Sequence, residues 1–562
     1  MARASTISAV LERGYTMEQL RGMDWDEFVE VTGLEPREID VTLRGTRYRC
    51  LDIPFWDPER KSGTHRRKTI GYYEGDRLIM SGSDEDTRPR TRPKAERYAV
   101  DSEIGRTLLL ESIAERIGLG GAVRDAFGKD APAILTCAYF MASCREPLTA
   151  CEQWSAQADT PYGGRLADQR ISELLQRIDA DGRARFFRTW MERVGEDDSY
   201  ALDITSISSY SESMAIVRAG YNRDRESLEQ INLALLIGSR SRLPVCYSVI
   251  PGNVNDKTSL ERFLHTVRAM GLERFSLVMD KGFCTAANMD EMQRMGLRFV
   301  QSMENRVDTA KSAIDSVRDG MARFDNYIRV YGSDVYAVTK HISRTVDGVT
   351  RGISVHVFYD PQKKLDEEAH LAERLDEARA AIMAGKGDAS QKALARKYLK
   401  VTRRGGAVQV TARQDAIEEA NRYSGFLVLL SNHVDDRAEA LRIYRDKETA
   451  ESAFDDLKNG MDMKRLRVRS ETALNGKMFI AFLGLALKLE MSNVMDRSPE
   501  LAGRTREEVL REMSILRSVR IGEGNEVFTE RTKLQKRVVK DFGIKTSFKD
   551  RLDSDRGQTE HS

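Results

Sequence analysis

One short run, residues 275–280 (FSLVMD), constrains the fold of this chain more than any other segment. It is almost continuously apolar before the aspartate, which is typical of a strand buried on both faces of a sheet. Asp280 and Gly282 end the run, so the strand stops at a carboxylate followed by a turn. The pattern predicts an α/β fold with Asp280 at the carboxyl edge of a sheet, where such sheets bind ligands.

A second strand-like run, residues 199–203 (SYALD), alternates in polarity and ends in Asp203. Two neighbouring strand ends of this kind would bring two carboxylates together. Like charges repel and raise one pKa unless a cation neutralises them, so the pair favours a divalent metal site. For either aspartate taken alone, a capping role at the following turn is the simpler interpretation.

The composition indicates a folded protein of several domains. The chain has 562 residues, of which 41% are hydrophobic and 31% charged, and one core seldom organises so long a chain. The 89 Lys and Arg residues almost cancel the 88 Asp and Glu residues, so contact with DNA would depend on local basic patches. The cysteines and histidines lack disulfide-framework or metal-site spacing.

The N-terminus lacks the apolar stretch of a signal peptide. The longest apolar run, residues 478–487, is about half a membrane span. This run predicts a buried helix, and the two observations together predict a cytoplasmic protein.

Helical and strand-like patterns occur in blocks along the chain. Helical periodicity dominates from residue 103 to about residue 194, strands and helices then alternate to about residue 305, and amphipathic helix returns from about residue 435. The sequence therefore predicts a small helical segment (1–50), a basic hairpin and linker (51–100), a helical domain for DNA binding or dimerisation (101–197), the first part of an α/β core (198–304), an inserted subdomain (305–425), the second part of the core (426–492) and a charged helical tail (493–562).

The helix expected from about residue 435 presents a narrow polar stripe. Tyr444, Lys447, Glu451 and Lys458 lie at offsets of 0, 3, 7 and 14, which span about 60° of arc at ~100° per residue. The stripe would place Glu451 and its flanking cations over the sheet. Without the two aspartates, a solvated row of ion pairs such as Lys447 with Glu451 would be the better interpretation.

These three regions together resemble a large class of bacterial insertion-sequence DDE transposases, the class with a Tyr-Arg-Glu-Lys signature. YRDKETAESAFDDLK (444–458) has the spacing of the signature, with Lys447 where the family usually has Arg. LDITSISSY (202–210) resembles the motif around the family's first Asp, and MDKGF (279–283) resembles the second. The likeness covers roughly residues 198–490. Lys447 keeps the charge of Arg but loses its two-pronged fit to phosphate.

The resemblance implies an RNase H-like mixed-sheet core with a β-rich insertion, preceded by a helical domain and followed by the charged tail. Asp203, Asp280 and Glu451 would hold two Mg²⁺ or Mn²⁺ ions, with Asp203 as the bridging ligand. The long separation between Asp280 and Glu451 also requires an inserted subdomain on physical grounds, because compact domains seldom contain structureless loops of that length.

The resemblance also implies a reaction and its partners. Metal-dependent cleavage at transposon ends would free a 3′-hydroxyl that attacks target DNA, and a DNA hairpin is a possible intermediate in this class. Double-stranded DNA would be the partner, a homodimer would pair the two ends, and no membrane or nucleotide cofactor is expected. The protein would act at the bacterial nucleoid. The expected DNA contacts are Tyr444, Lys447 and Lys458 from the signature, and Lys464, Arg465 and Arg467 from the basic run that follows.

Two other interpretations stay open. A metal-dependent nuclease or resolvase on the same fold would cut DNA without rejoining it. A DNA-binding protein derived from a transposase would have lost catalysis. The presence of Asp203, Asp280 and Glu451 argues against the latter, because a retired site has no physical reason to keep three ligands.

Overall fold

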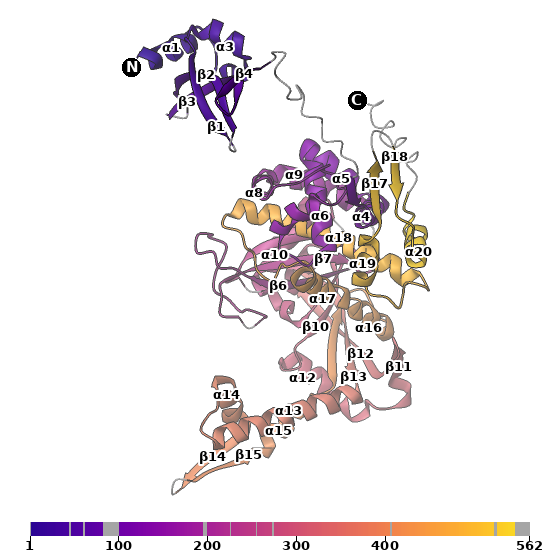
Figure 1. Cartoon of the computed structure of the whole chain (residues 1–562). Coiled ribbons are helices and arrows are strands. Elements are labelled where there is room, and N and C mark those ends of the chain that lie inside the picture. The colour runs from indigo at the N-terminus through magenta and orange to yellow at the C-terminus, as the bar shows by residue number, and fades with distance from the viewer. Residues whose placement is uncertain are drawn as a thin grey trace. The chain divides into compact units, whose positions relative to one another are not determined.

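The computed structural model describes residues 2–43, 46–59, 62–81, 100–194, 199–224, 226–254, 256–272, 275–404, 407–521 and 525–545. The described residues before position 82 form one compact unit, and those from Val100 onward form nearly all of a second (Figure 1).

The first unit combines helices with an antiparallel sheet. α1 (Ala2–Glu12), α2 (Met17–Gly22) and α3 (Trp25–Thr32) precede β1 (Arg37–Leu43), β2 (Thr46–Asp57), β3 (Ser62–Glu74) and β4 (Arg77–Met80), which pair in chain order. Ile53 is buried among the helices, and the Phe55 ring lies 5.3 Å from that of Phe28. The boundary expected at residue 50 is therefore wrong, because it falls inside β2, whose side chains pack against the helices. The linker expected before residue 100 lies mostly outside the described residues.

A block of helices opens the second unit and confirms the helical domain expected before the sheet. It contains α4 (Gly105–Arg116), α5 (Leu119–Phe127), α6 (Ala131–Ser143), α7 (Cys151–Ser155), α8 (Asp168–Arg177) and α9 (Ala180–Val194). Trp190 of α9 is fully buried, and its Nε1 donates to the carbonyl oxygen of Pro244 at 2.9 Å. This hydrogen bond attaches the helical block to the sheet.

The core of the second unit is a mixed sheet. β6 (Ser199–Ser208), β7 (Gln230–Gly238) and β8 (Pro244–Pro251) form an antiparallel meander, and β9 (Ser276–Met279) and β10 (Arg298–Met303) continue the sheet parallel to β6. All four residues of β9 are buried, as the apolar run predicts. The arrangement confirms the expected RNase H-like core. However, β6 continues to Ser208, so Asp203 lies within the strand and not at its end.

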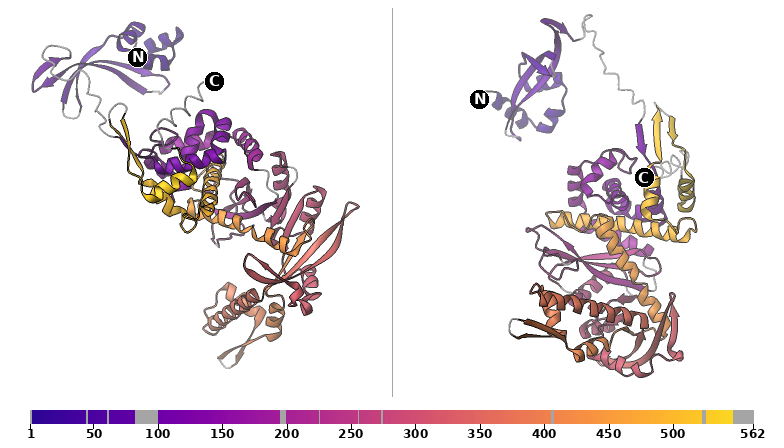
Figure 2. Two further views of the ribbon diagram at one scale, coloured as in Figure 1. Left: turned by 90° about the vertical axis from the view of Figure 1, so that its right-hand side faces the viewer. Right: turned by 60° about the horizontal axis from the view of Figure 1, so that its bottom comes forward.

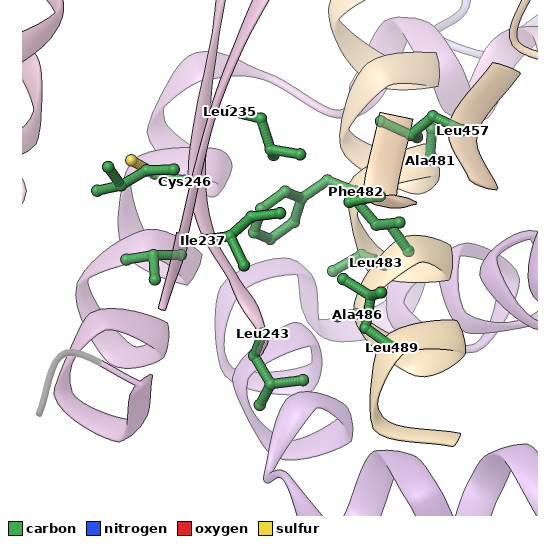
Figure 3. Close-up of a cluster of buried hydrophobic side chains, with 14 of the residues drawn as sticks. Leu235, Ile237, Leu243, Cys246, Leu457, Ala481, Phe482, Leu483, Ala486 and Leu489 are labelled. Atoms are coloured by element: carbon green, nitrogen blue, oxygen red, sulfur yellow. The ribbon is translucent and has the colours of Figure 1, made fainter. Parts of the chain in front are cut away.

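One long helix, α18 (Glu471–Arg497), crosses the centre of this unit. Figure 3 shows Phe482 pointing from α18 toward Leu235 and Ile237 of β7. The helix is long and apolar enough to span a membrane, but 94% of its most apolar window is buried inside the protein. The buried helix expected at residues 478–487 is therefore confirmed.

The segment expected as an inserted subdomain divides into two parts. β11 (Tyr327–Val330), β12 (Ser333–Val346) and β13 (Val349–Tyr359) extend the central sheet, because β13 pairs with β16 (Phe426–Ser431), which itself pairs with β10. The remainder has its own small core and leads away from the sheet along α13 (Figure 1, Figure 2). It comprises α13 (Pro361–Met383), α14 (Ala389–Tyr398), β14 (Leu399–Arg404), β15 (Ala407–Ala412) and α15 (Gln414–Asn421).

Three shorter helices flank the sheet: α10 (Asp256–Ala269), α11 (Ala286–Arg294) and α12 (Asp308–Asp315). The signature segment forms α16 (Arg437–Arg445), α17 (Glu448–Asp455) and a π-helical turn, η6 (Asp456–Gly460). The tail contains α19 (Arg506–Ser514), β17 (Arg517–Ile521), β18 (Asn525–Phe528) and α20 (Lys533–Phe542). The tail is not purely helical, because β17 pairs with β5 (Val100–Glu103) ahead of the helical block.

Candidate active site

Asp203 and Asp280 are neighbours across two parallel strands. Leu202 of β6 pairs with Met279 of β9, so the next residue along each strand is one of the two aspartates. Burial, assisted by the charge of Asp280, raises the pKa of Asp203 to about 6. A raised pKa is the response expected of a carboxylate that shares a partly desolvated site with another.

Asp280 is kept ionised by its surroundings. Ser302 Oγ of β10 and Tyr444 OH of α16 both donate to Asp280 Oδ1, at 3.0 and 3.1 Å. Burial alone would raise the pKa of Asp280, but the Lys447 charge and these hydrogen bonds hold it below its usual value. Burial and the Asp280 charge raise the pKa of Tyr444 to about 12, so the phenol keeps the proton that it donates.

Lys447 supplies a positive charge to all three predicted carboxylates. Its Nζ donates to Glu451 Oε1 at 2.7 Å, and its charge favours the ionised forms of Asp203 and Asp280. Lys447 is only 7% exposed. Burial would lower the pKa of Lys447, but the Glu451 hydrogen bond and the Asp280 charge raise it well above its usual value. The ammonium therefore stays charged, bonded to Glu451 and within electrostatic reach of both aspartates.

Glu451 is connected to the aspartates through Lys447. Its side chain is 58% exposed on α17 and lines a separate hollow of about 610 Å³. Among the described residues, the ligand atoms of Glu261, His265 and Glu291 lie within 4.8 Å of one another, whereas those of the three predicted ligands do not form such a group. The structure therefore joins Glu451 to Lys447 but does not bring the three predicted carboxylates within ligand distance of one another.

The expectation of one continuous signature helix is wrong. Lys447 N donates to the carbonyl oxygen of Tyr444, three residues back, and Tyr331 OH donates to Asp446 Oδ1 at 2.8 Å where α16 ends. A tight turn thus separates α16 from α17, and a wide π turn follows at η6. Because the helical pitch changes twice, the signature side chains do not form one straight stripe. Single π turns are frequent at functional sites.

Lys458, in η6, is paired with an acid that the sequence interpretation did not single out. Its Nζ lies 2.9 and 2.7 Å from the two carboxylate oxygens of Asp224. Asn222 Oδ1 accepts from the backbone N–H groups of Asp224 and Glu226, at 2.9 and 3.3 Å, so one side chain orders both acids. The Lys458 side chain is only 10% exposed.

The basic run after the signature lies beside the strand that carries Asp203. Arg465 forms a parallel bridge with Ser208, and Leu466 N donates to the Ser208 carbonyl oxygen at 3.1 Å. The cations of this run are also paired with acids: Arg465 and Lys464 approach Glu226 at 2.6 and 3.8 Å, and Arg467 approaches Asp462 at 3.3 Å.

Several residues of this site were missed by the sequence interpretation. Ser302 follows no motif, and its role depends on the pairing of β10 with β9. Asp224 and Glu226 lie in GYNRDRESLEQINLALLI, a segment that resembles the family only in general. The alternation of acids and arginines in NRDRE was the one local signal that could have drawn attention to them.

Comparison with known proteins gives a family match over the second unit. Residues 195–487 match the family described as "Transposase DDE domain". No curated protein matches the sequence. One similar solved structure is a cryo-EM structure of a piggyBac transposase synaptic complex with hairpin DNA, which is 9% identical. That match covers 80% of this chain and 81% of the other with a TM-score of 0.35, which is too low to support an argument about the site.

Proposed function

The chain belongs to the transposase DDE domain family, and from this premise we propose that it cuts DNA at the ends of a transposable element and joins those ends to target DNA. Asp203, Asp280 and Glu451 are the proposed catalytic carboxylates. The observation that carries the proposal is the register of β6 and β9, which sets Asp203 beside Asp280, with Lys447 linking both to Glu451.

The donor set fits the divalent metal ions that the family uses. Carboxylate oxygens are hard ligands, which suits Mg²⁺ or Mn²⁺ better than softer metals. Asp203, Asp280 and Glu451 would hold these ions. When bound, such a pair of ions activates the attacking oxygen and stabilises the leaving oxygen of a phosphodiester.

Some of the protein's own groups are already arranged for metal binding, and others must change when the ions bind. Ser302 and Tyr444 fix Asp280 Oδ1, which keeps that ligand ionised and oriented. Asp203 must be ionised, which requires a pH above its raised pKa of about 6, and Glu451 must exchange its bond to Lys447 for a place beside the aspartates. Lys447 is then released to contact a phosphate of the DNA, as its place in the signature suggests.

The reaction has two chemical steps on the DNA. Water attacks the phosphorus at the transposon end, the bond to the 3′-oxygen breaks, and a 3′-hydroxyl is freed. That hydroxyl then attacks a phosphodiester of the target, so one P–O bond forms as another breaks. A hairpin intermediate, which belongs to this proposal, adds two steps between them: the 3′-hydroxyl attacks the opposite strand at the transposon end and releases the flanking DNA, and water then reopens the hairpin and frees the 3′-hydroxyl again. The DNA contacts of Lys458, Lys464, Arg465 and Arg467 also belong to this proposal.

The proposed assembly is a homodimer, because pairing of two ends needs two active sites. The proposed location is the bacterial nucleoid, where the DNA substrate lies.

The experiment that tests the proposal is incubation of the full chain with DNA that flanks its own gene, with and without Mg²⁺. We expect Mg²⁺-dependent nicks at the element ends and joined products with a supercoiled target plasmid. Asp203→Asn, Asp280→Asn and Glu451→Gln should each abolish both products while DNA binding persists. The matched control is Glu115→Gln, an exposed acid on α4. Nicks without joined product would instead indicate a nuclease, and binding without nicks a non-catalytic protein.

A further inference from the structure

Two hollows lie between Asp280 and the part of the insertion formed by α13, α14 and α15. The first hollow, of about 530 Å³, is lined by Asp280, Tyr444 and Lys447. The second hollow, of about 470 Å³, is lined by residues of α13, α14 and α15. The two hollows share Asn305, Arg306 and Glu367 in their linings, so they adjoin one another, and we call the two together the channel.

The junction between the two hollows is firmly built. Asn305 Nδ2 donates to the carbonyl oxygens of Tyr423 and Phe426, at 3.3 and 2.7 Å. Gly425 N donates to Glu367 Oε2 at 2.8 Å. These bonds fix the start of β16 against both the loop after β10 and the helix α13. The junction therefore has a fixed floor between the sheet and the insertion.

Cationic side chains outnumber carboxylates along this channel. Arg306 stands at the junction and Arg374 on the insertion side, and both are exposed. Within the part of the chain that the structure describes, neither guanidinium forms an ion pair, whereas Lys458 and Arg465 are each neutralised by an acid. Cations without partners attract phosphates more strongly than paired ones, because no internal bond must break first. The other cations of the lining are Lys281, Lys311, Lys363, Lys397 and Lys447, and the carboxylates are Asp280, Glu304, Glu367 and Glu419.

We propose that the insertion side of this channel binds the sugar-phosphate backbone of the DNA strand that extends from the cleavage point, with Arg306 and Arg374 as phosphate contacts. This inference rests on the proposed function, because it assumes that the strand enters at Asp280. In this proposal, α13, α14 and α15 help to hold the DNA substrate.

The test is DNA binding by Arg306→Gln, Arg374→Gln and the double variant, measured in EDTA so that no cleavage occurs. Fluorescence anisotropy over a series of salt concentrations gives Kd and its salt dependence for two duplexes, one with the element's end and one of unrelated sequence. Each lost phosphate contact should reduce the slope of log Kd against log salt by about 0.9. We expect this loss and a several-fold weaker Kd on both duplexes. Arg351→Gln, an exposed arginine of β13 that lines neither hollow, is the control and should bind as the wild type does.

An unchanged Kd and slope in the double variant would overturn the inference while leaving the proposed function intact. Weaker binding on the element's end alone would indicate contacts to bases and would contradict a backbone role. A wild type that binds with the expected slope but never cuts its own ends would remove the proposed function and leave the DNA channel standing. A wild type that binds neither duplex would end both.

Discussion

Lys447 Nζ lies 2.7 Å from Glu451 Oε1, and the same ammonium favours the ionised forms of Asp203 and Asp280. One buried lysine thus interacts favourably with acids from three elements, β6, the end of β9 and α17. This pairing holds Glu451 at the lysine, so Glu451 must leave Lys447 to join the aspartates. It also means that metal binding must compete with an internal cation.

The raised pKa of Asp203 predicts how stability depends on pH. The folded protein keeps this proton up to about pH 6, whereas the usual pKa is 3.8. The free energy of unfolding of the metal-free protein should therefore fall as pH rises from about 4 to about 6, because the unfolded chain loses the proton first. The free energy of unfolding of Asp203→Asn should lack the part of this fall that comes from Asp203. Urea unfolding in EDTA across that range measures it, with the exposed Asp376→Asn as control; identical profiles for wild type and Asp203→Asn would contradict the account.

The bond from Tyr444 to Asp280 predicts a graded effect on metal dependence. Tyr444→Phe removes one hydrogen bond and leaves the ring, so the pKa of Asp280 should rise and the Mg²⁺ concentration for half-maximal cleavage should increase. A hydrogen bond to a charged group contributes about 1.5–3 kcal/mol, so roughly a tenfold or larger change is expected. Thermal unfolding should show that the variant is folded. A Mg²⁺ requirement equal to that of the wild type would remove Tyr444 from the site.

The pair of Lys458 with Asp224 predicts that this acid opposes DNA binding. Asp224→Asn should free the ammonium for phosphate and tighten binding about fivefold, which corresponds to about 1 kcal/mol for a partly exposed ion pair. The gain should disappear in a Lys458→Gln background, since the freed cation is then absent. Anisotropy with an unrelated duplex at low salt measures both. Weaker binding by Asp224→Asn would show instead that the acid positions Lys458.

The packing of α18 predicts that loss of the Phe482 ring destabilises the protein strongly. Phe482 is 3% exposed, and its ring lies 5.2 Å from that of Phe187 and 5.4 Å from that of Tyr247. Phe482→Ala should lower the free energy of unfolding by about 3–5 kcal/mol. Phe324→Ala removes a ring that is 88% exposed and should change it little. Urea unfolding of the two variants compares them directly, and equal losses would contradict this placement of the core.

Local patterns in the sequence were sufficient for the elements that position the site. The apolar run before Asp280 predicts a doubly buried strand, and the run at residues 478–487 predicts a buried helix, because each pattern depends only on neighbouring residues. The placement of Asp203 opposite Asp280 needed one further assumption, that their strands are adjacent. The register of Leu202 with Met279 supplies that adjacency.

Features that depend on contacts between distant residues could not be predicted in this way. The break at Asp446 involves Tyr331, and Lys458 pairs with an acid 234 positions earlier. Likewise, nothing local indicates that β11, β12 and β13 extend the central sheet beyond β16. In each case the decisive partner lies in another element, so periodicity and propensity carry no information about it.

Asp203, Asp280 and Glu451 are proposed to hold a pair of metal ions together. Electron paramagnetic resonance of Mn²⁺ added to the full chain bound to its own end DNA tests this most directly. The account predicts two coupled Mn²⁺ ions in the wild type and loss of the coupled signal in Asp203→Asn, Asp280→Asn and Glu451→Gln alike. A coupled signal that survives in Glu451→Gln would contradict it.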